Sequence, residues 1–283
     1  MNNMLSKGKD SAFRRIITVI ILLPLFVLLV LKASPKVFGG VTVLAVLWGG
    51  VEWVTLMGVR KFPSVIVFPL LILALIYTSI DFAVPVPMVM LAAACWWLIA
   101  AILVVRYPRH AALWSQNVII KALMGVFCLV PCWIAINYIR LSFIDGPDTL
   151  LFVFLLIWAM DSGAWFAGRK WGKTPLMPSV SPGKTREGLL GGLVAAGCVT
   201  VFALYWSKTP FQIIPGAVVL CLMTAIFSVV GDLFESMLKR EAGIKDSGCL
   251  LPGHGGLLDR IDSLLAAAPV FVFGAMLLEK ILR

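Results

Sequence analysis

Apolar stretches long enough to cross a lipid bilayer follow one another along most of the chain. A membrane-spanning helix needs about 20 mostly apolar residues. Hydrophobic residues make up 61% of the sequence and charged residues only 13%, whereas about a quarter of the residues of a soluble domain are charged. We therefore predict an all-α, polytopic transmembrane helical bundle. We expect nine spans, at approximately 16–32, 38–58, 64–82, 84–105, 117–138, 149–167, 188–206, 211–231 and 263–281.

Basic residues between these spans indicate the orientation, because cytosolic loops carry an excess of Lys and Arg. With the N-terminus in the cytosol, 18 Lys and Arg residues fall on the inner side and 6 on the outer side. This distribution favours an odd number of spans, a cytosolic N-terminus and an outer C-terminus. The short chain, in which we find no organellar targeting segment, favours a multi-pass protein of a bacterial inner membrane.

The charges are also distributed unevenly along the chain. The net charge of +10 fits basic cytosolic loops and anionic lipid headgroups, and no nucleic-acid-binding motif accompanies it, so we expect no nucleic-acid partner. Most ionisable residues beyond position 160 fall within 161–187 and 232–262. We expect a single integral membrane domain over 1–283, with mainly anchoring spans in 1–148, a catalytic half in 149–283 and cytosolic loops at 168–187 and 232–262.

The most informative stretch begins where the span expected at 211–231 ends. If that helix continues, Asp232, Glu235 and Ser236 share one of its faces. A glycine-rich loop around His254 follows, and then Asp259-Arg-Ile-Asp262 places two carboxylates three residues apart. Carboxylates from two helix ends can thus converge beside several cations. Mg²⁺ is usually bound by one or two carboxylates together with substrate phosphates, so this pattern indicates phosphoryl or nucleotidyl transfer. The alternative is an ordinary charged loop with surface ion pairs.

The order of these residues resembles the signature of the phosphatidate cytidylyltransferase (CDP-diacylglycerol synthase) family. In that pattern S-x-x-K-R is followed, after four residues, by K-D and then by P-x-H-G-G-x-x-D-R-x-D. Every fixed position occurs here between Ser236 and Asp262. The stretches 161–169 and 181–188 are similar to two other cytosolic stretches of the family, although Gly183 stands where a further Lys is expected. The first 140 residues match only as variable apolar spans.

The resemblance implies an Mg²⁺-dependent reaction of CTP with phosphatidic acid that gives CDP-diacylglycerol and pyrophosphate. A second cation and a homodimer are left open. On this basis we predict catalytic roles for Lys239, Arg240, Lys245, Asp246, His254 and Arg260. We predict substrate contacts for Ser236, Asp161, Lys173, Ser181, Lys184 and Glu187, and metal ligation by Asp232, Asp259 and Asp262.

Three other functions remain to be weighed. A transporter would concentrate its ionisable groups near the bilayer midplane, whereas the charges here gather at one face. A related CTP-dependent enzyme acting on another lipid phosphate would carry the same motif, which does not fix the lipid tail. A purely structural membrane scaffold would leave the ordered acidic and basic loop without a reason.

Two features of the spans are also open to more than one interpretation. Glu52 lies inside the second span, where an acidic residue is a functional candidate, but local pairing or snorkelling near the cytosolic end would explain it equally well. A group of small residues follows the 181–187 loop, and we expect it to allow close helix packing rather than to bind a ligand. The group consists of Gly188, Gly191, Gly192, Ala195 and Ala196.

Overall fold

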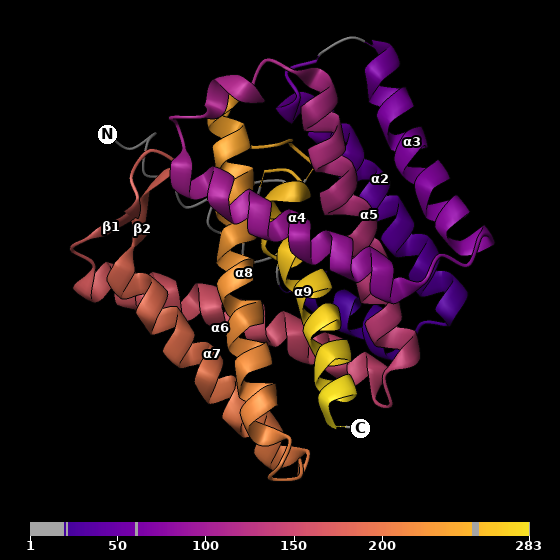
Figure 1. Cartoon of the computed structure of the whole chain (residues 1–283), viewed down its shortest axis with the longest axis vertical. Helices are drawn as coiled ribbons and strands as arrows, with labels where there is room; N and C mark the ends of the chain where they lie inside the picture. Colours follow the sequence, from indigo (N-terminus) through magenta and orange to yellow (C-terminus); the bar gives the residue numbers. More distant parts are fainter. Residues whose placement is uncertain (1–19, 21, 60–61, 251–254, 283) are drawn as a thin grey trace.

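The computed structural model describes residues 20, 22–59, 62–250 and 255–282 (Figure 1). Within these residues, eight helices are long and apolar enough to cross a membrane, which confirms a polytopic helical fold. A shorter apolar helix, Leu22–Lys32, precedes them, so the first expected span lies partly outside the described residues. The eight helices are α2 (Pro35–Leu56), α3 (Phe62–Asp81), α4 (Val86–Arg106), α5 (Val118–Ser142), α6 (Gly146–Trp171), α7 (Arg186–Trp206), α8 (Ile214–Glu241) and α9 (Leu258–Leu282).

Two of these helices extend well beyond the apolar stretches that predicted them. Helix α8 continues without a break to Glu241, ten residues past the expected end of its span, and so carries the first half of the signature. Helix α6 continues to Trp171, which places Asp161 nearly three turns before its end, at about 3.6 residues per turn. The predicted continuation of α8 is therefore confirmed.

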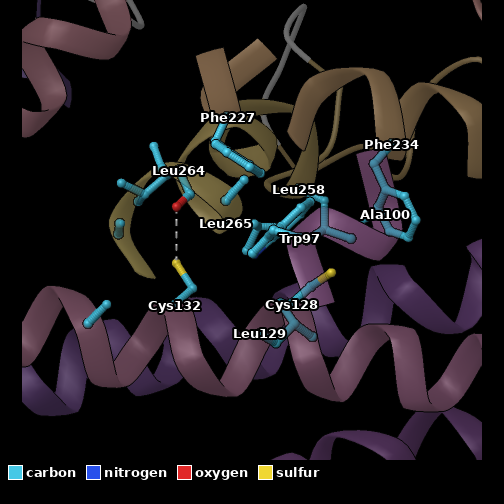
Figure 2. Packing of buried hydrophobic residues seen from close by; sticks show 14 of the residues in the cluster. Trp97, Ala100, Cys128, Leu129, Cys132, Phe227, Phe234, Leu258, Leu264 and Leu265 are labelled. Atoms are coloured by element: carbon cyan, nitrogen blue, oxygen red, sulfur yellow. Dashed lines mark hydrogen bonds between the residues drawn. The ribbon is translucent and has the colours of Figure 1, made fainter. Parts of the chain in front are cut away.

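A buried apolar core joins α4, α5, α8 and α9 next to the charged ends of α8 and α9 (Figure 2). The rings of Trp97 and Phe234 meet edge to face, with centroids 5.8 Å apart. The thiol of Cys132 donates a hydrogen bond to the carbonyl oxygen of Leu264, with a sulfur–oxygen distance of 3.7 Å. Phe234 and Leu258 precede acidic residues of the signature, so this packing fixes the direction in which the neighbouring carboxylates point.

Helices α6 and α7 approach each other through small residues. A Cβ atom added to Gly192 would lie 2.6 Å from the carbonyl oxygen of Met160, and one added to Gly191 would lie 2.2 Å from the Cβ of Ala167. Real Cβ atoms do not approach so closely, so these positions require glycine. The interpretation of the small-residue group as a packing surface is confirmed for these two glycines.

The expected 168–187 loop contains a small antiparallel hairpin of strands β1 (Pro175–Met177) and β2 (Ser181–Thr185). Pro175 lies opposite Thr185, and Met177 lies opposite Ser181. Figure 1 shows the hairpin beside the C-terminal part of α8, on the side where α6 ends and α7 begins. These strands were not predicted, because Pro and Gly are disfavoured in strands and occupy three of the eight strand positions.

Side chains near the C-terminal end of α8 hold this helix to its neighbours. The Arg240 Nε donates a hydrogen bond to the carbonyl oxygen of Val180 at 3.1 Å, which attaches the hairpin to α8. The hydroxyl of Tyr107, just after α4, donates to the Glu241 carboxylate at 2.9 Å. Burial, followed by this hydrogen bond, raises the pKa of Tyr107 to about 12, so the hydroxyl remains a donor at neutral pH.

We predict that Gly192→Ala lowers the melting temperature of the detergent-solubilised protein, because the added methyl group would overlap the backbone of Met160. Overpacking of this kind typically costs about 1–3 kcal/mol. Gly197→Ala in the same helix is the matched control, since no atom lies within 4 Å of its added Cβ, and a helical Gly→Ala change gains up to about 1 kcal/mol. Equal melting temperatures for the two variants would contradict the close packing of α6 against α7.

Candidate active site

Ion pairs connect α8 to the hairpin on one side and to α9 on the other. The Lys184 ammonium of β2 pairs with Asp232 of α8. The Lys239 ammonium of α8 lies 2.7 Å from Glu235 of its own helix and 2.7 Å from Asp259 of α9. Because the side chains of Glu235 and Asp259 are only 1% and 7% exposed, Lys239 compensates two carboxylates that water barely reaches.

A second contact between α8 and α9 brings carboxylates together. The Asp262 side chain lies within hydrogen-bonding reach of Glu235 and also interacts electrostatically with Asp232 and Lys184. The Oε1 atom of Glu235 is buried and receives no hydrogen bond from any donor among the described residues. Two adjacent carboxyl groups are stable in a buried position only when a proton or a cation lies between them. This position can therefore hold a shared proton or bind a cation.

Asp259 lies one turn earlier on α9 and has a different environment. Its Oδ2 accepts hydrogen bonds from the backbone N–H groups of Ser247 at 3.0 Å and Gly256 at 2.8 Å, and from the Ser247 hydroxyl at 3.1 Å. Its Oδ1 accepts from Lys239 at 2.7 Å. Both oxygens are thus engaged by the loop before α9 and by α8.

The three predicted metal ligands are consequently not gathered at one point. Asp232 and Asp262 interact with each other, whereas Asp259 is held by loop donors and Lys239. Within the described part of the chain, no group of three or more His, Cys, Asp or Glu side chains is arranged to hold a metal ion. Two carboxylates still match the ligand set of Mg²⁺, which takes its remaining ligands from substrate phosphates and water. The ligand roles themselves stay predictions.

A cavity of about 420 Å³ opens beside Asp232. Asp161 lies in its wall and interacts electrostatically with Asp232 and Lys184, so the structure brings these three predicted site residues together. The walls combine polar and apolar groups, which suits a ligand with a phosphate and a hydrocarbon part. They are formed by Asp161, Ala164, Trp165, Gly168, Arg169, Leu176, Gly183, Lys184, Thr185, Gly188, Leu189, Val229 and Asp232.

Other predicted substrate contacts have structural partners. Glu187 accepts hydrogen bonds from the backbone N–H groups of Lys173 and Thr174, both at 3.1 Å, and so fastens the base of the hairpin to α7. The Ser236 hydroxyl is 3.4 Å from Asp232 Oδ1. Ser181 is half-buried at the start of β2. None of these contacts tests the predicted roles toward CTP.

The remaining predicted catalytic residues lie around the loop between α8 and α9. Lys245 and Asp246 are exposed on this loop, and Arg260 is exposed on the first turn of α9. His254 lies outside the described residues. Arg240, as described above, uses its Nε to hold the hairpin, which is a structural use of a residue predicted to contact phosphate.

Three residues that the structure places in or beside the site have no role predicted from the sequence. Glu235 lies between Lys239 and Asp262, Ser247 contacts Asp259, and Arg169 lines the cavity with its guanidinium 5.3 Å from the ring of Trp165. A usable signal existed for Glu235, because its spacing of three from Asp232 and four from Lys239 puts all three on one helix face. Nothing local in the sequence pointed to Ser247.

Comparisons with known proteins identify relatives over nearly the full chain. Residues 13–278 match the model of the cytidylyltransferase family. A protein of Haemophilus influenzae named phosphatidate cytidylyltransferase is 44% identical over 189 residues, which cover 64% of this chain and 66% of that protein. A protein of Pseudomonas aeruginosa with the same name is 38% identical over 261 residues, covering 91% of this chain and 94% of that protein. One from Staphylococcus haemolyticus, named likewise, is 34% identical over 194 residues, or 60% and 74% of the two chains.

We predict that Lys239→Gln destabilises the protein by about 3–5 kcal/mol, because removing one partner leaves uncompensated buried carboxylates. Chemical unfolding in a mild detergent measures this loss. Lys245→Gln is the control, since this lysine is exposed on the loop and surface changes usually stay within about 0.5 kcal/mol. Similar unfolding free energies for both variants would show that Lys239 is not needed to hold α8 and α9 together.

Proposed function

This chain belongs to the cytidylyltransferase family, and from that premise we propose that it transfers the cytidylyl group of CTP to phosphatidic acid. The products are CDP-diacylglycerol and pyrophosphate. The observation that carries the proposal is the ion-paired signature of α8 and α9 beside a cavity with both polar and apolar walls. The bacterial relatives named phosphatidate cytidylyltransferase support the same substrates.

The reaction exchanges one phosphorus–oxygen bond for another. An oxygen of the lipid phosphomonoester forms a bond to the α-phosphorus of CTP. The bond from that phosphorus to the oxygen bridging it to the β-phosphorus breaks, and its electron pair leaves with pyrophosphate. Because a phosphomonoester has a second pKa of about 6, the nucleophile is already anionic at neutral pH. The enzyme therefore needs charge neutralisation and alignment more than a strong base.

Asp232 and Asp262 are the residues best placed to hold Mg²⁺, with Oε1 of Glu235, which accepts no hydrogen bond from the residues that the structure describes, beside them. The bound ion would neutralise phosphate charge. Asp259, the third predicted ligand, has donors on both oxygens, and we assign it to orient Lys239 and the loop before α9. Lys184, which faces the cavity, can exchange Asp232 for a substrate phosphate.

The cavity suits a lipid substrate that keeps its acyl chains in the bilayer. Trp165 and Leu189 contribute apolar surface, whereas Lys184 and Arg169 contribute positive charge. A headgroup can therefore reach the carboxylates while its tails stay among α6, α7 and the lipid. This arrangement supports an active site at the inner leaflet of a bacterial inner membrane with the N-terminus in the cytosol, as the distribution of basic residues predicts.

We predict that the purified protein converts radiolabelled CTP and phosphatidic acid in mixed micelles into CDP-diacylglycerol, and that a chelator stops the reaction. Other lipid phosphates, including an ether lipid and a polyprenyl phosphate, test the alternative substrates in the same assay. A clear preference for one of these over phosphatidic acid would replace the proposed lipid. Substrate flux in proteoliposomes without nucleotide would favour a transporter instead.

We predict that Asp232→Asn and Asp262→Asn each lower turnover by about 100-fold or more, the usual scale for losing electrostatic stabilisation of the transition state. Both should also raise the Mg²⁺ concentration that gives half-maximal rate. Asp259→Asn should lower turnover without shifting that concentration, because it disturbs Lys239 and the loop. Asp81→Asn, at the exposed end of α3, is the control. Near-normal turnover of the Asp262 variant would refute its assignment as a ligand.

A further inference from the structure

We infer that Glu52, a buried carboxylate of the anchoring half, is a positioning residue. It holds Ser247 of the loop between α8 and α9, and the start of α9, in the arrangement needed for activity. Its effect on turnover rests on the proposed function, whereas its effect on the loop does not. Glu52 belongs to α2 and is only 4% exposed. About two hundred residues of sequence separate it from its partners Ser247, Leu257 and Leu258, so these contacts join the two halves of the chain directly.

The Glu52 carboxylate accepts hydrogen bonds from the backbone N–H groups of the residue before α9 and of the first residue of α9. Leu257 donates to Oε1 at 2.9 Å, and Leu258 donates to Oε2 at 2.8 Å. The first N–H groups of a helix have no acceptor within the helix, and the positive end of the helix dipole favours an anion there. Glu52 thus caps α9 from a different helix. Asp259, which orients Lys239, and Asp262, a ligand candidate, follow within the next turn and a half, at about 3.6 residues per turn.

Ser247 connects Glu52 to Asp259. Its hydroxyl oxygen lies 3.2 Å from Glu52 Oε2 and 3.1 Å from Asp259 Oδ2. A serine hydroxyl has one proton to donate, so the two carboxylates compete for it, and the hydroxyl sets the spacing between them. The backbone N–H of Ser247 also donates to Asp259. Displacing Glu52 therefore removes a constraint, transmitted through Ser247, on the position of Asp259, the residue that orients Lys239.

Two glycines of the loop close around the Glu52 carboxylate. A Cβ atom added to Gly248 would lie 2.5 Å from Oε1, and one added to Gly256 would lie 2.6 Å from Oε2. Gly256 is the second glycine of the family's H-G-G sequence. The close approach of Glu52 explains in physical terms why both positions lack a side chain.

The charge of Glu52 is balanced by dipoles. Within the described ranges, the ion pairs involve other residues, namely Lys184, Asp232, Glu235, Lys239 and Asp259. Besides the α9 and Ser247 donors, Glu52 accepts from the indole N–H of Trp48 at 3.1 Å. A buried carboxylate held by N–H and O–H donors needs all of them in place, because each unmade bond leaves part of the charge unsolvated. The loop and the carboxylate therefore fix each other.

The test replaces Glu52 with Gln, which keeps the shape but exchanges one acceptor oxygen for an NH₂ group. One of the two α9 N–H groups then meets a donor. Hydrogen–deuterium exchange of peptides covering 242–250 and 255–262 should become about tenfold faster or more, as expected for the loss of a charge-assisted hydrogen bond. Turnover of CTP and phosphatidic acid should fall roughly 10- to 100-fold, the usual effect of losing a residue that orients catalytic groups.

Asn137→Ala is the matched structural control. Asn137 is also buried, at 8% exposure, and it contacts α2 by donating to the Thr42 hydroxyl at 3.3 Å. This variant should lower the melting temperature while turnover and exchange in 255–262 stay at the wild-type level. A merely structural Glu52 would give the same pattern as Asn137, and that result would overturn the inference.

Gly248→Ala provides a second variant in case Glu52→Gln does not fold, because its methyl group would push the carboxylate away from an intact α2. It should accelerate exchange in 255–262 and reduce turnover in the same way. Wild-type turnover in either folded variant would refute the positioning role. If the wild-type protein makes no CDP-lipid but exchange still accelerates in the variants, the proposed reaction fails while the structural link of Glu52 to α9 stands.

Discussion

The Lys239 ammonium lies between two buried carboxylates, 2.7 Å from Glu235 of its own helix and 2.7 Å from Asp259, and the second of these contacts joins α8 to α9. The positive charge of Lys239 offsets the cost of keeping Glu235 and Asp259 charged at such low exposure. The apolar packing of Trp97 against Phe234 on the other side of α8 prevents the helix from turning these groups toward solvent. Glu235 and Lys239 therefore face Asp259 of α9, while Asp232, three residues before Glu235, lines the cavity where a polyanionic substrate can be bound.

The hairpin and the loop before α9 extend this arrangement in two directions. Lys184 and Arg240 connect the hairpin with α8, so the wall of the cavity and the ion-paired helix are held in register. Ser247 and Gly256 connect the loop with Asp259. Through Glu52, that loop is also anchored to α2. The anchoring half of the chain thus helps to build the site rather than only holding it in the membrane.

Hydropathy predicted the spans because the length and apolarity of a helix are local properties of the sequence. The continuation of α8 through Asp232 and Glu235 could also be predicted, since spacings of three and four place charges on one face. The separation of Asp259 from Asp232 could not, because it depends on where the loop donors of Ser247 and Gly256 lie. For Glu52, the sequence left two roles open, since its partners at Ser247, Leu257 and Leu258 are more than 190 residues away. Such pairing is fixed by tertiary packing alone.

The contact between α6 and α7 has a mechanical consequence for the cavity that both helices border. Where a glycine of one helix packs against the backbone of the other, as Gly192 does against Met160, few side-chain atoms lie between the helices. We therefore expect α6 and α7 to move as one rigid unit. The hairpin and α8 border the cavity on its other side, and their contacts there are ion pairs and hydrogen bonds made by long side chains. We therefore expect any change in the shape of the cavity on substrate binding or product release to occur where the hairpin meets α8, because long side chains there can rearrange.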